Sequence, residues 1–175
     1  MPGPFFAALE TKPVVAPGLE WLGRLTTADG APADAASLSG KCVALYFSAH
    51  WCPPCRKFTP ILKDVYAEVN DALAKQFEVV FVSSDESAEA QRDYMAAMHG
   101  PWLTIRHDDL QREALKRRFG CYGAKEQPKW PDVARRAGIP SLVVVAPDGA
   151  ELVFEARDQL QKLGPAAVAK WPKWS

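Results

Sequence analysis

Residues 43–58 read VALYFSAHWCPPCRKF, and this stretch decides both the fold and the chemistry of the chain. The apolar run Val43–Phe47 predicts a short strand that is buried on both faces. Two cysteines separated by two prolines follow this run, and a helical pattern comes directly after them. The sequence therefore predicts that Cys52 lies at the start of a helix and that Cys55 lies one turn further on.

Two cysteines in this position indicate redox chemistry. Amide groups at a helix start and the positive end of the helix dipole stabilise an anion, so the Cys52 thiol should ionise more easily than a free cysteine. Such a thiolate attacks a disulfide and is then released by its neighbouring thiol. Two other interpretations of the cysteine pair are half of a zinc site and an inert, purely structural pair. Zinc normally needs a second Cys or His pair at short spacing, which Cys42, Cys121 and the three histidines do not provide. We therefore expect no bound metal and no other cofactor.

Composition restricts the remaining classes of function. The chain has 175 residues with 48% hydrophobic content, which suits one domain with its own core. Its 21 basic and 21 acidic residues balance, so neither nucleic acid nor an anionic membrane is an expected partner. No apolar run is long enough for a membrane span, and the N-terminus lacks the basic start of a secretory signal. Four cysteines without a regular spacing favour a reducing compartment, so we expect the protein in the cytoplasm. We also expect it to be a monomer.

Hydrophobic periodicity predicts the order of the elements. Residues 1–18 hold four prolines and are expected to form an irregular lead-in, with one domain over 19–175. Ser87 and Asp109 are expected helix caps, and Pro60 should kink the helix that contains it. The expected strands are 21–27, 43–47, 77–83, 142–146 and 151–154, and residues 102–105 form a short apolar piece. The expected helices are 54–73, 87–98, 109–119 and 158–170. This order predicts an α/β fold with a mixed sheet covered by helices on both faces.

The amino-acid sequences of several segments resemble those of one known family. The run from Tyr46 to Pro60 resembles the tryparedoxin and nucleoredoxin branch of the thioredoxin superfamily, which has WCPPC where thioredoxin has WCGPC. The segments 77–86, Pro101–Leu103 and Gly138–Ser141 are similar to the same branch. The resemblance covers roughly residues 20–160. It implies a thioredoxin-like fold with a central mixed sheet.

The resemblance also implies roles for individual residues. Cys52 would be the nucleophile and Cys55 the resolving thiol of a protein-disulfide oxidoreductase. Ile139 and Pro140 would form a cis-proline loop that pairs with an incoming substrate beside the disulfide. Arg157 aligns with a basic position that meets a substrate carboxylate in tryparedoxins.

Three hypotheses of function follow from the resemblance. Tryparedoxins carry electrons from the dithiol trypanothione to peroxiredoxin-type and glutathione-peroxidase-type peroxidases, and this is the favoured hypothesis. Nucleoredoxins take part in redox-sensitive signalling complexes, and a module of this kind is the alternative. A thioredoxin-fold scaffold without redox activity, whose insertion carries the function, is the third hypothesis.

Some residues depart from the family pattern. Tyr46 stands where thioredoxin has a buried aspartate, so proton handling must come from water, Tyr46 or another group. Ser84 stands where tryparedoxins often have a tryptophan, which favours a resemblance to nucleoredoxin. A single short domain and the Trp171–Trp174 segment at its end favour a resemblance to tryparedoxin. Residues 121–137 read as an insertion, since the family spacing before Gly138 is a few residues. This insertion is expected to remodel the face near Pro140.

Residues around the motif have individual expectations. Trp51 precedes the nucleophile, and its large amphipathic ring suits a docking surface. Pro53 and Pro54 remove two amide donors, so the pKa of Cys52 should exceed that in a WCGPC loop. The expected reduction potential is roughly −270 to −200 mV. Arg56 either supports the thiolate or is a solvated helix charge.

Other reactive residue types have simpler interpretations. His50 is expected at the surface, and Cys42 is expected to be a packed apolar thiol. Cys121 is either packed or a second reactive thiol. Asp108 and Asp109 could form a carboxylate pair, but Asp109 is better explained as a helix cap.

Overall fold

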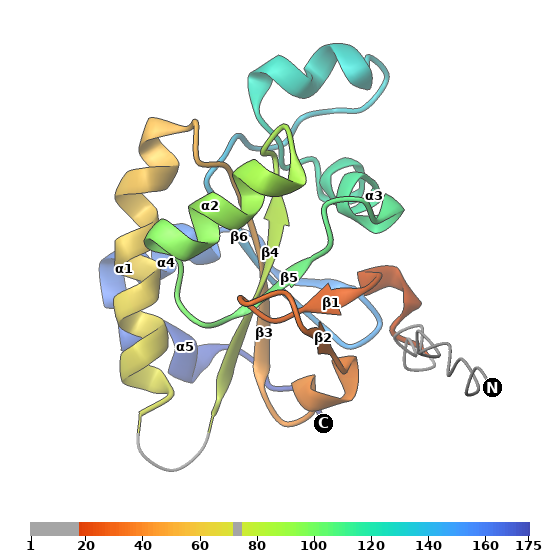
Figure 1. Ribbon diagram of the computed structural model, residues 1–175. Helices are drawn as coiled ribbons and strands as arrows, with labels where there is room; N and C mark the ends of the chain where they lie inside the picture. The colour runs from red at the N-terminus through yellow and green to blue at the C-terminus, as the bar shows by residue number, and fades with distance from the viewer. Residues whose placement is uncertain (1–17, 72–74) are drawn as a thin grey trace, which may run out of the picture.

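The computed structural model describes residues 18–71 and 75–175, so the expected lead-in at 1–18 lies outside the described residues except for Gly18. Within this part of the chain seven strands form one sheet, in the order β2-β1-β5-β4-β3-β6-β7 (Figure 1). The strands are β1 Leu25–Thr26, β2 Pro32–Ala33, β3 Cys42–Ser48, β4 Phe77–Ser83, β5 Leu103–Ile105, β6 Ser141–Val145 and β7 Glu151–Val153. Because β3 runs parallel to β4 and antiparallel to β6, the sheet is mixed, as predicted.

Helices cover both faces of this sheet. They are α1 Pro53–Val69, α2 Ala88–Met98, α3 Leu110–Phe119, α4 Ala156–Leu163 and α5 Pro165–Lys170, with 3-10 turns at Glu20–Leu22 (η1), Ala35–Leu38 (η2) and Ala124–Lys129 (η3). Figure 1 shows α1 and α3 on opposite sides of the central strands. No helix of the described residues is long and apolar enough to cross a membrane.

The central strand β3 shows why the two faces are both buried. Successive side chains of a strand point to opposite faces. Ala44 and Tyr46 therefore join the core formed with α1, α2, α4 and α5, whereas Leu45 and Phe47 join the core formed with α3. A strand with apolar neighbours on both sides needs the continuous apolar run that the sequence has. The predicted α/β architecture is confirmed.

Two predicted elements at the N-terminal and C-terminal ends are wrong in detail. The expected strand at 21–27 is a 3-10 turn followed by the two-residue strand β1, because Gly23 adopts a φ of 71° and interrupts the run. The expected helix at 158–170 is two helices, α4 and α5. Gly164 between them has a φ of 57°, and Pro165 has no amide hydrogen to continue the first helix.

The helix that carries the cysteines also differs from its expected span. It begins at Pro53 and passes through Pro60 without ending there. It ends at Val69, because the side chain of Asn70 binds the backbone of the chain that enters β4, accepting from the Phe77 N–H and donating to the Phe77 carbonyl oxygen. The expected end, Leu73, lies outside the described residues.

Candidate redox site

The cysteine pair lies where β3 passes into α1. Strand β3 ends at Ser48, and Cys52 is the N-cap residue of α1. Pro53 and Pro54 occupy the first helical positions and have no amide hydrogen, so the first available donor is the Cys55 N–H. This amide points at the Cys52 sulfur at 3.3 Å. The predicted placement of Cys52 at the helix start is confirmed.

The two cysteines form a disulfide, with their Cα atoms 5.2 Å apart. Cys55 is fully buried, and Cys52 keeps 4% of its surface exposed because Ala49 and Ile139 pack against the pair. This exposure is small for a nucleophile that must reach the disulfide of a partner. Cys52 is nevertheless the more exposed of the two cysteines. Among the described residues, no three His, Cys, Asp or Glu side chains group closely enough to hold a metal ion.

The loop before β6 faces the disulfide. The Ile139–Pro140 peptide bond is cis, and the Ile139 carbonyl oxygen lies 3.6 Å from the Cys52 sulfur. Arg157 donates to the Pro140 carbonyl oxygen at 2.9 Å and also pairs with Asp158. Ile139, Pro140 and Arg157 line one cavity of about 240 Å³. The structure thus brings together residues that the sequence predicted from two distant segments.

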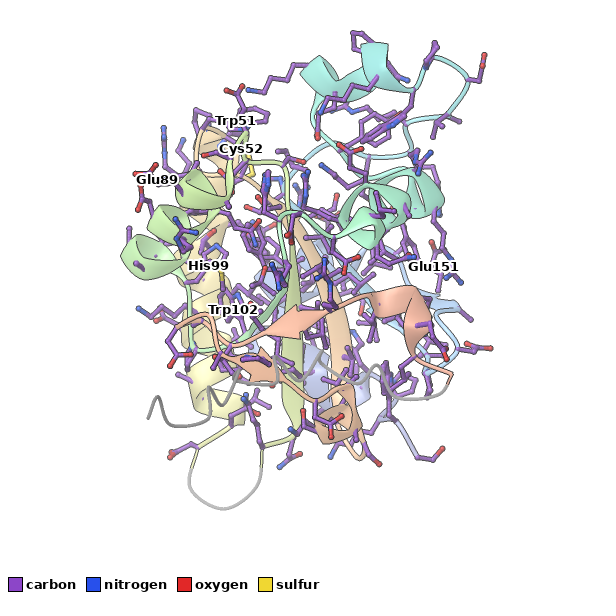
Figure 2. All side chains as sticks on the ribbon, turned by 45° about the vertical axis from the view of Figure 1, so that its right-hand side comes forward. Trp51, Cys52, Glu89, His99, Trp102 and Glu151 are labelled. Atoms are coloured by element: carbon purple, nitrogen blue, oxygen red, sulfur yellow. A yellow bond between two sulfur atoms is a disulfide. The ribbon has the colours of Figure 1, made fainter. Side chains whose placement is uncertain are left out.

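Trp51 is held beside the disulfide on several sides. Its indole N–H donates to the Ser84 carbonyl oxygen at 3.0 Å, and 36% of its surface stays exposed. The Lys125 ammonium lies 3.6 Å from the ring centroid, which is a cation–π contact. Gly123 approaches the ring so closely that a Cβ atom there would lie 2.8 Å from Trp51. Figure 2 shows Trp51 and Cys52 together at one end of the molecule.

Arg56 and His50 brace the turn that leads to the cysteines. The Arg56 guanidinium donates to the His50 carbonyl oxygen at 3.0 Å. The His50 amide donates to the buried Asp85 carboxylate at 2.8 Å, and its ring stacks on Tyr94 with the ring centroids 5.1 Å apart. His50 is therefore intermediate in exposure, because the turn carries its ring onto Tyr94 of α2 and only part of its surface reaches solvent.

Hydroxyl groups occupy the interior behind the site, and sequence reasoning missed most of them. Thr59 donates to the Cys55 carbonyl oxygen at 2.7 Å and contacts the Tyr46 and Tyr94 hydroxyls at 2.7 and 2.6 Å. Ser48 contacts the Tyr94 hydroxyl at 2.7 Å. Burial raises the pKa of Tyr46 well above its ordinary value, so this hydroxyl stays protonated. Tyr46 is therefore not the base that replaces the aspartate of thioredoxin.

A buried ion pair beside the site was also missed. The fully buried Lys116 ammonium lies 2.7 Å from the Glu126 carboxylate, which also accepts from the Ser84 hydroxyl at 2.7 Å and the Gly123 N–H at 2.8 Å. Burial opposes ionisation, but these partners hold the pKa of Glu126 below its ordinary value. One signal was available in the sequence: Lys116 precedes Phe119 by three residues and shares its buried face of α3.

The remaining candidate residues are structural. Cys42 and Cys121 are fully buried, and burial raises the pKa of their thiols to about 12 and about 11. The reactive alternative for Cys121 is therefore disfavoured. Asp109 caps α3 by accepting from the Gln111 N–H at 2.9 Å, as predicted. Asp108 pairs with Arg106 and shares Arg24 with Asp109, so the two carboxylates meet at one arginine and have a structural role.

Comparison with known proteins agrees with this geometry. A family model described as thioredoxin-like matches residues 40–151, a range that includes both cysteines and the cis-proline. The predicted thioredoxin-like fold is confirmed, and the chain is a thioredoxin-family redox protein.

Individual relatives place the chain more narrowly within the thioredoxin-like proteins. The tryparedoxin of Trypanosoma brucei brucei is 37% identical over 137 residues, which cover 78% of this chain and 83% of that protein. The nucleoredoxin of Mus musculus is 35% identical over 136 residues, which cover 77% of this chain and 27% of that protein. A tryparedoxin II solved in complex with glutathionylspermidine matches with a TM-score of 0.67 at 36% identity, over 89% of this chain and 99% of that chain. The chain belongs to the tryparedoxin and nucleoredoxin family.

The two groups of relatives differ in how much of them is matched. The chain spans about a quarter of the length of the nucleoredoxins, 27% in the mouse protein, but most of the length of the tryparedoxin. Together, the disulfide and the family describe a thioredoxin-like oxidoreductase that is related to both groups.

Proposed function

We propose that this protein is a tryparedoxin-like thiol–disulfide oxidoreductase in which Cys52 is the nucleophile and Cys55 the resolving thiol. One observation carries this proposal: the bonded pair lies at the start of α1, and the sulfur of Cys52, the more exposed of the two cysteines, lies 3.6 Å from the Ile139 carbonyl oxygen. A partner that reaches Cys52 must therefore contact the cis-proline loop as well.

The reaction is a balanced exchange of two electrons. The Cys52 thiolate of the reduced protein attacks a partner disulfide, forming a mixed disulfide and releasing one partner sulfur as a thiolate, which takes up a proton. Cys55 loses its proton and attacks the Cys52 sulfur. This step forms the Cys52–Cys55 bond and frees the second partner sulfur as a thiol. A dithiol then reduces the pair by the same steps in reverse and leaves as a disulfide.

The family supports particular partners. We propose a dithiol of the trypanothione type as reductant and peroxidases of the peroxiredoxin or glutathione-peroxidase type as clients, which gives the protein an antioxidant role. Support comes from the related tryparedoxin II that was solved with glutathionylspermidine. Arg157 is the proposed partner of a substrate carboxylate, since its guanidinium lines the cavity beside Pro140.

The other residues of the site are proposed to serve docking and shape. Trp51, Ile139 and Pro140 would contact the incoming partner, because Ile139 packs against the cysteine pair, Pro140 follows Ile139, and Trp51 precedes Cys52. Pro53, Pro54 and Arg56 would fix the turn that presents the sulfur. Cys42 and Cys121 are unpaired and buried, which suits a reducing compartment, and we propose the cytosol.

A reconstituted assay tests the proposal. Trypanothione, a peroxidase and peroxide are combined with the protein, and peroxide consumption is followed. Wild type should support robust flux, Cys52→Ser none, and Cys42→Ser flux equal to wild type. Absence of flux with wild type, or flux that survives Cys52→Ser, rejects the tryparedoxin-like activity.

A nucleoredoxin-like interaction module is the second candidate. It is favoured by Ser84, which stands where tryparedoxins often have tryptophan, and by the similarity to nucleoredoxins. In this function the thiols gate the binding of a partner protein. Wild type that reduces insulin or dithionitrobenzoate but accepts no electrons from trypanothione would favour this candidate.

Trapping identifies the client in either case. A Cys55→Ser protein stalls at the mixed disulfide because the resolving thiol is missing. Mass spectrometry of the trapped complexes should return peroxidases for the first function and signalling proteins for the second. The Cys52→Ser, Cys55→Ser double variant, which should trap nothing, is the control.

A further inference from the structure

The two ends of the loop formed by residues 121–137 are hydrogen-bonded to each other. The Gly120 carbonyl oxygen accepts from the N–H groups of Arg136 and Ala137 at 2.8 and 3.1 Å, and Cys121 bridges Ala137. Compact loops with adjacent ends are common carriers of function. In Figure 1 the η3 turn of this loop stands at the end of the molecule where β4 finishes.

The buried ion pair anchors this loop to the end of β4. Lys116 comes from α3 and Glu126 from η3, while Ser84, which follows β4, donates to the same carboxylate. The Lys116 ammonium also donates to the Ser83 carbonyl oxygen at 3.2 Å. Removing one partner of a buried pair leaves an uncompensated charge, so loss of Lys116 or Glu126 alone should weaken the docking of the loop.

The anchored loop positions Trp51 next to the nucleophile. The Ser84 carbonyl oxygen accepts from the Trp51 indole N–H, and Gly123 and Lys125 of the loop contact the Trp51 ring. Ser84 and Lys125 also border a cavity of about 250 Å³, which Arg112, Glu126 and Lys129 line as well.

The charges in and around this cavity are balanced, because Arg112 and Lys129 lie 3.8 and 3.6 Å from the Glu113 carboxylate. Glu126 is neutralised by Lys116, and Asp85 accepts from the His50 N–H and the Ser83 hydroxyl. Glu86 pairs with Lys125 at 3.1 Å, but both side chains are exposed, and exposed pairs are weak enough for a ligand to replace them. Lys125 can therefore exchange the exposed Glu86 for a carboxylate on a ligand.

We propose that the 121–137 loop is one wall of the disulfide-binding face and that Lys125 binds a carboxylate of a peptide that carries the disulfide. Lys125 is then a substrate-contacting residue, and Lys116 and Glu126 are positioning residues. The inference rests on the proposed oxidoreductase function and adds the chemistry of its partner, an acidic side chain near the reactive cysteine.

A pair of synthetic peptide disulfides tests the role of Lys125. The two peptides are identical except for Glu or Gln beside the cysteine. Wild type should reduce the Glu peptide with a kcat/KM about five-fold higher, the size of one good charged contact. Lys125→Gln should lose this preference. Lys170→Gln, which changes an exposed lysine at the end of α5, should keep it.

The outcomes separate the two levels of the proposal. A wild-type protein that reduces neither peptide rejects the oxidoreductase function itself. Equal reduction of both peptides by wild type, or a Glu preference that persists in Lys125→Gln, rejects the carboxylate site and leaves the oxidoreductase function standing.

Gly123→Ala tests the positioning of Trp51 without removing a charge. The φ of −67° at Gly123 is accessible to alanine, so the added methyl group acts through its contact with the Trp51 ring. We expect KM for both peptides to rise about five-fold with kcat unchanged, because docking is altered and the thiols are not. Gly100→Ala, which meets the Trp102 ring at 2.7 Å, is the matched control and should leave KM unchanged. A wild-type KM in Gly123→Ala overturns the positioning role.

Discussion

His99 is a residue whose surroundings set its charge. Figure 2 shows it near Trp102, away from the cysteine end of the molecule. Its Nδ1 atom accepts from the Trp102 indole N–H at 3.0 Å, so Nε2 carries the proton of the neutral ring. Nε2 is buried and has no hydrogen-bond partner among the described residues. Burial accordingly lowers the pKa of His99 from 6.5 to about 3.

This shift predicts a loss of stability in acid. Below pH 6.5 the unfolded chain binds a proton at His99 that the folded protein does not bind. The stabilisation is therefore complete above pH 6.5 and is lost as the pH falls toward 3. The loss approaches about 1.4 kcal/mol per pH unit within this window. Urea unfolding at several pH values measures it.

His99→Gln is the comparison for this prediction. Its amide oxygen can still accept from Trp102, but the side chain does not titrate. The free energy of unfolding of wild type should fall more steeply between pH 6.5 and 4 than that of the variant. Parallel curves for the two proteins would contradict the buried neutral histidine.

Single residues also mark the limit of what sequence predicts. Cys52, Cys55 and Pro140 were predictable because local motifs carry them. The pairing of Lys116 with Glu126 was not, because it depends on how a long loop folds back over α3. Residues that act through tertiary contacts leave little trace in periodicity or spacing.

At the scale of elements, the central strands were the most predictable part. Runs such as Phe77–Ser83 are apolar on both faces, and their ends match the observed strand. Short edge elements were less predictable, because β1 has two residues and is defined by its partners β2 and β5. Helix caps at Ser87 and Asp109 are observed as predicted, because their side chains bond nearby amides.

The break between α4 and α5 allows a test at this scale. Gly164 has a φ of 57° and a ψ of −136°, a region that alanine adopts only with strain, and a Cβ atom there would meet nothing within 4 Å. Gly164→Ala should therefore lower the free energy of unfolding by about 1–2 kcal/mol through the backbone alone. Chemical denaturation measures this change.

Ala166→Gly in α5 is the control for that change. It should cost about 0.5–1 kcal/mol through helix propensity without affecting the break. Stabilisation by Gly164→Ala would show that the two helices can join into one, and it would contradict the assigned role of the glycine.

At the scale of the whole molecule, the sheet separates two cores, and each holds one thiol that takes no part in the proposed exchange. Cys42 lies in the core with α1 and Cys121 in the core with α3. Their thiols have a pKa raised to about 12 and about 11, so very little thiolate exists at neutral pH.

Alkylation of the reduced, folded protein should distinguish these two buried thiols from Cys52. Iodoacetamide at pH 7.5 is expected to modify Cys52 first, and Cys42 and Cys121 should react only after denaturant is added. Peptide mapping by mass spectrometry at successive times identifies the sites. Labelling of Cys121 at the rate of Cys52 in native conditions would mean that the 121–137 loop opens readily.

The order of the strands has a practical consequence for handling the protein. The sheet ends at β2, with two residues, and at β7, with three. Borders this short present few unpaired backbone groups to a neighbouring molecule. Concentrated solutions should therefore resist fibril growth and precipitation through strand-to-strand stacking, a property that favours crystallisation trials and long storage.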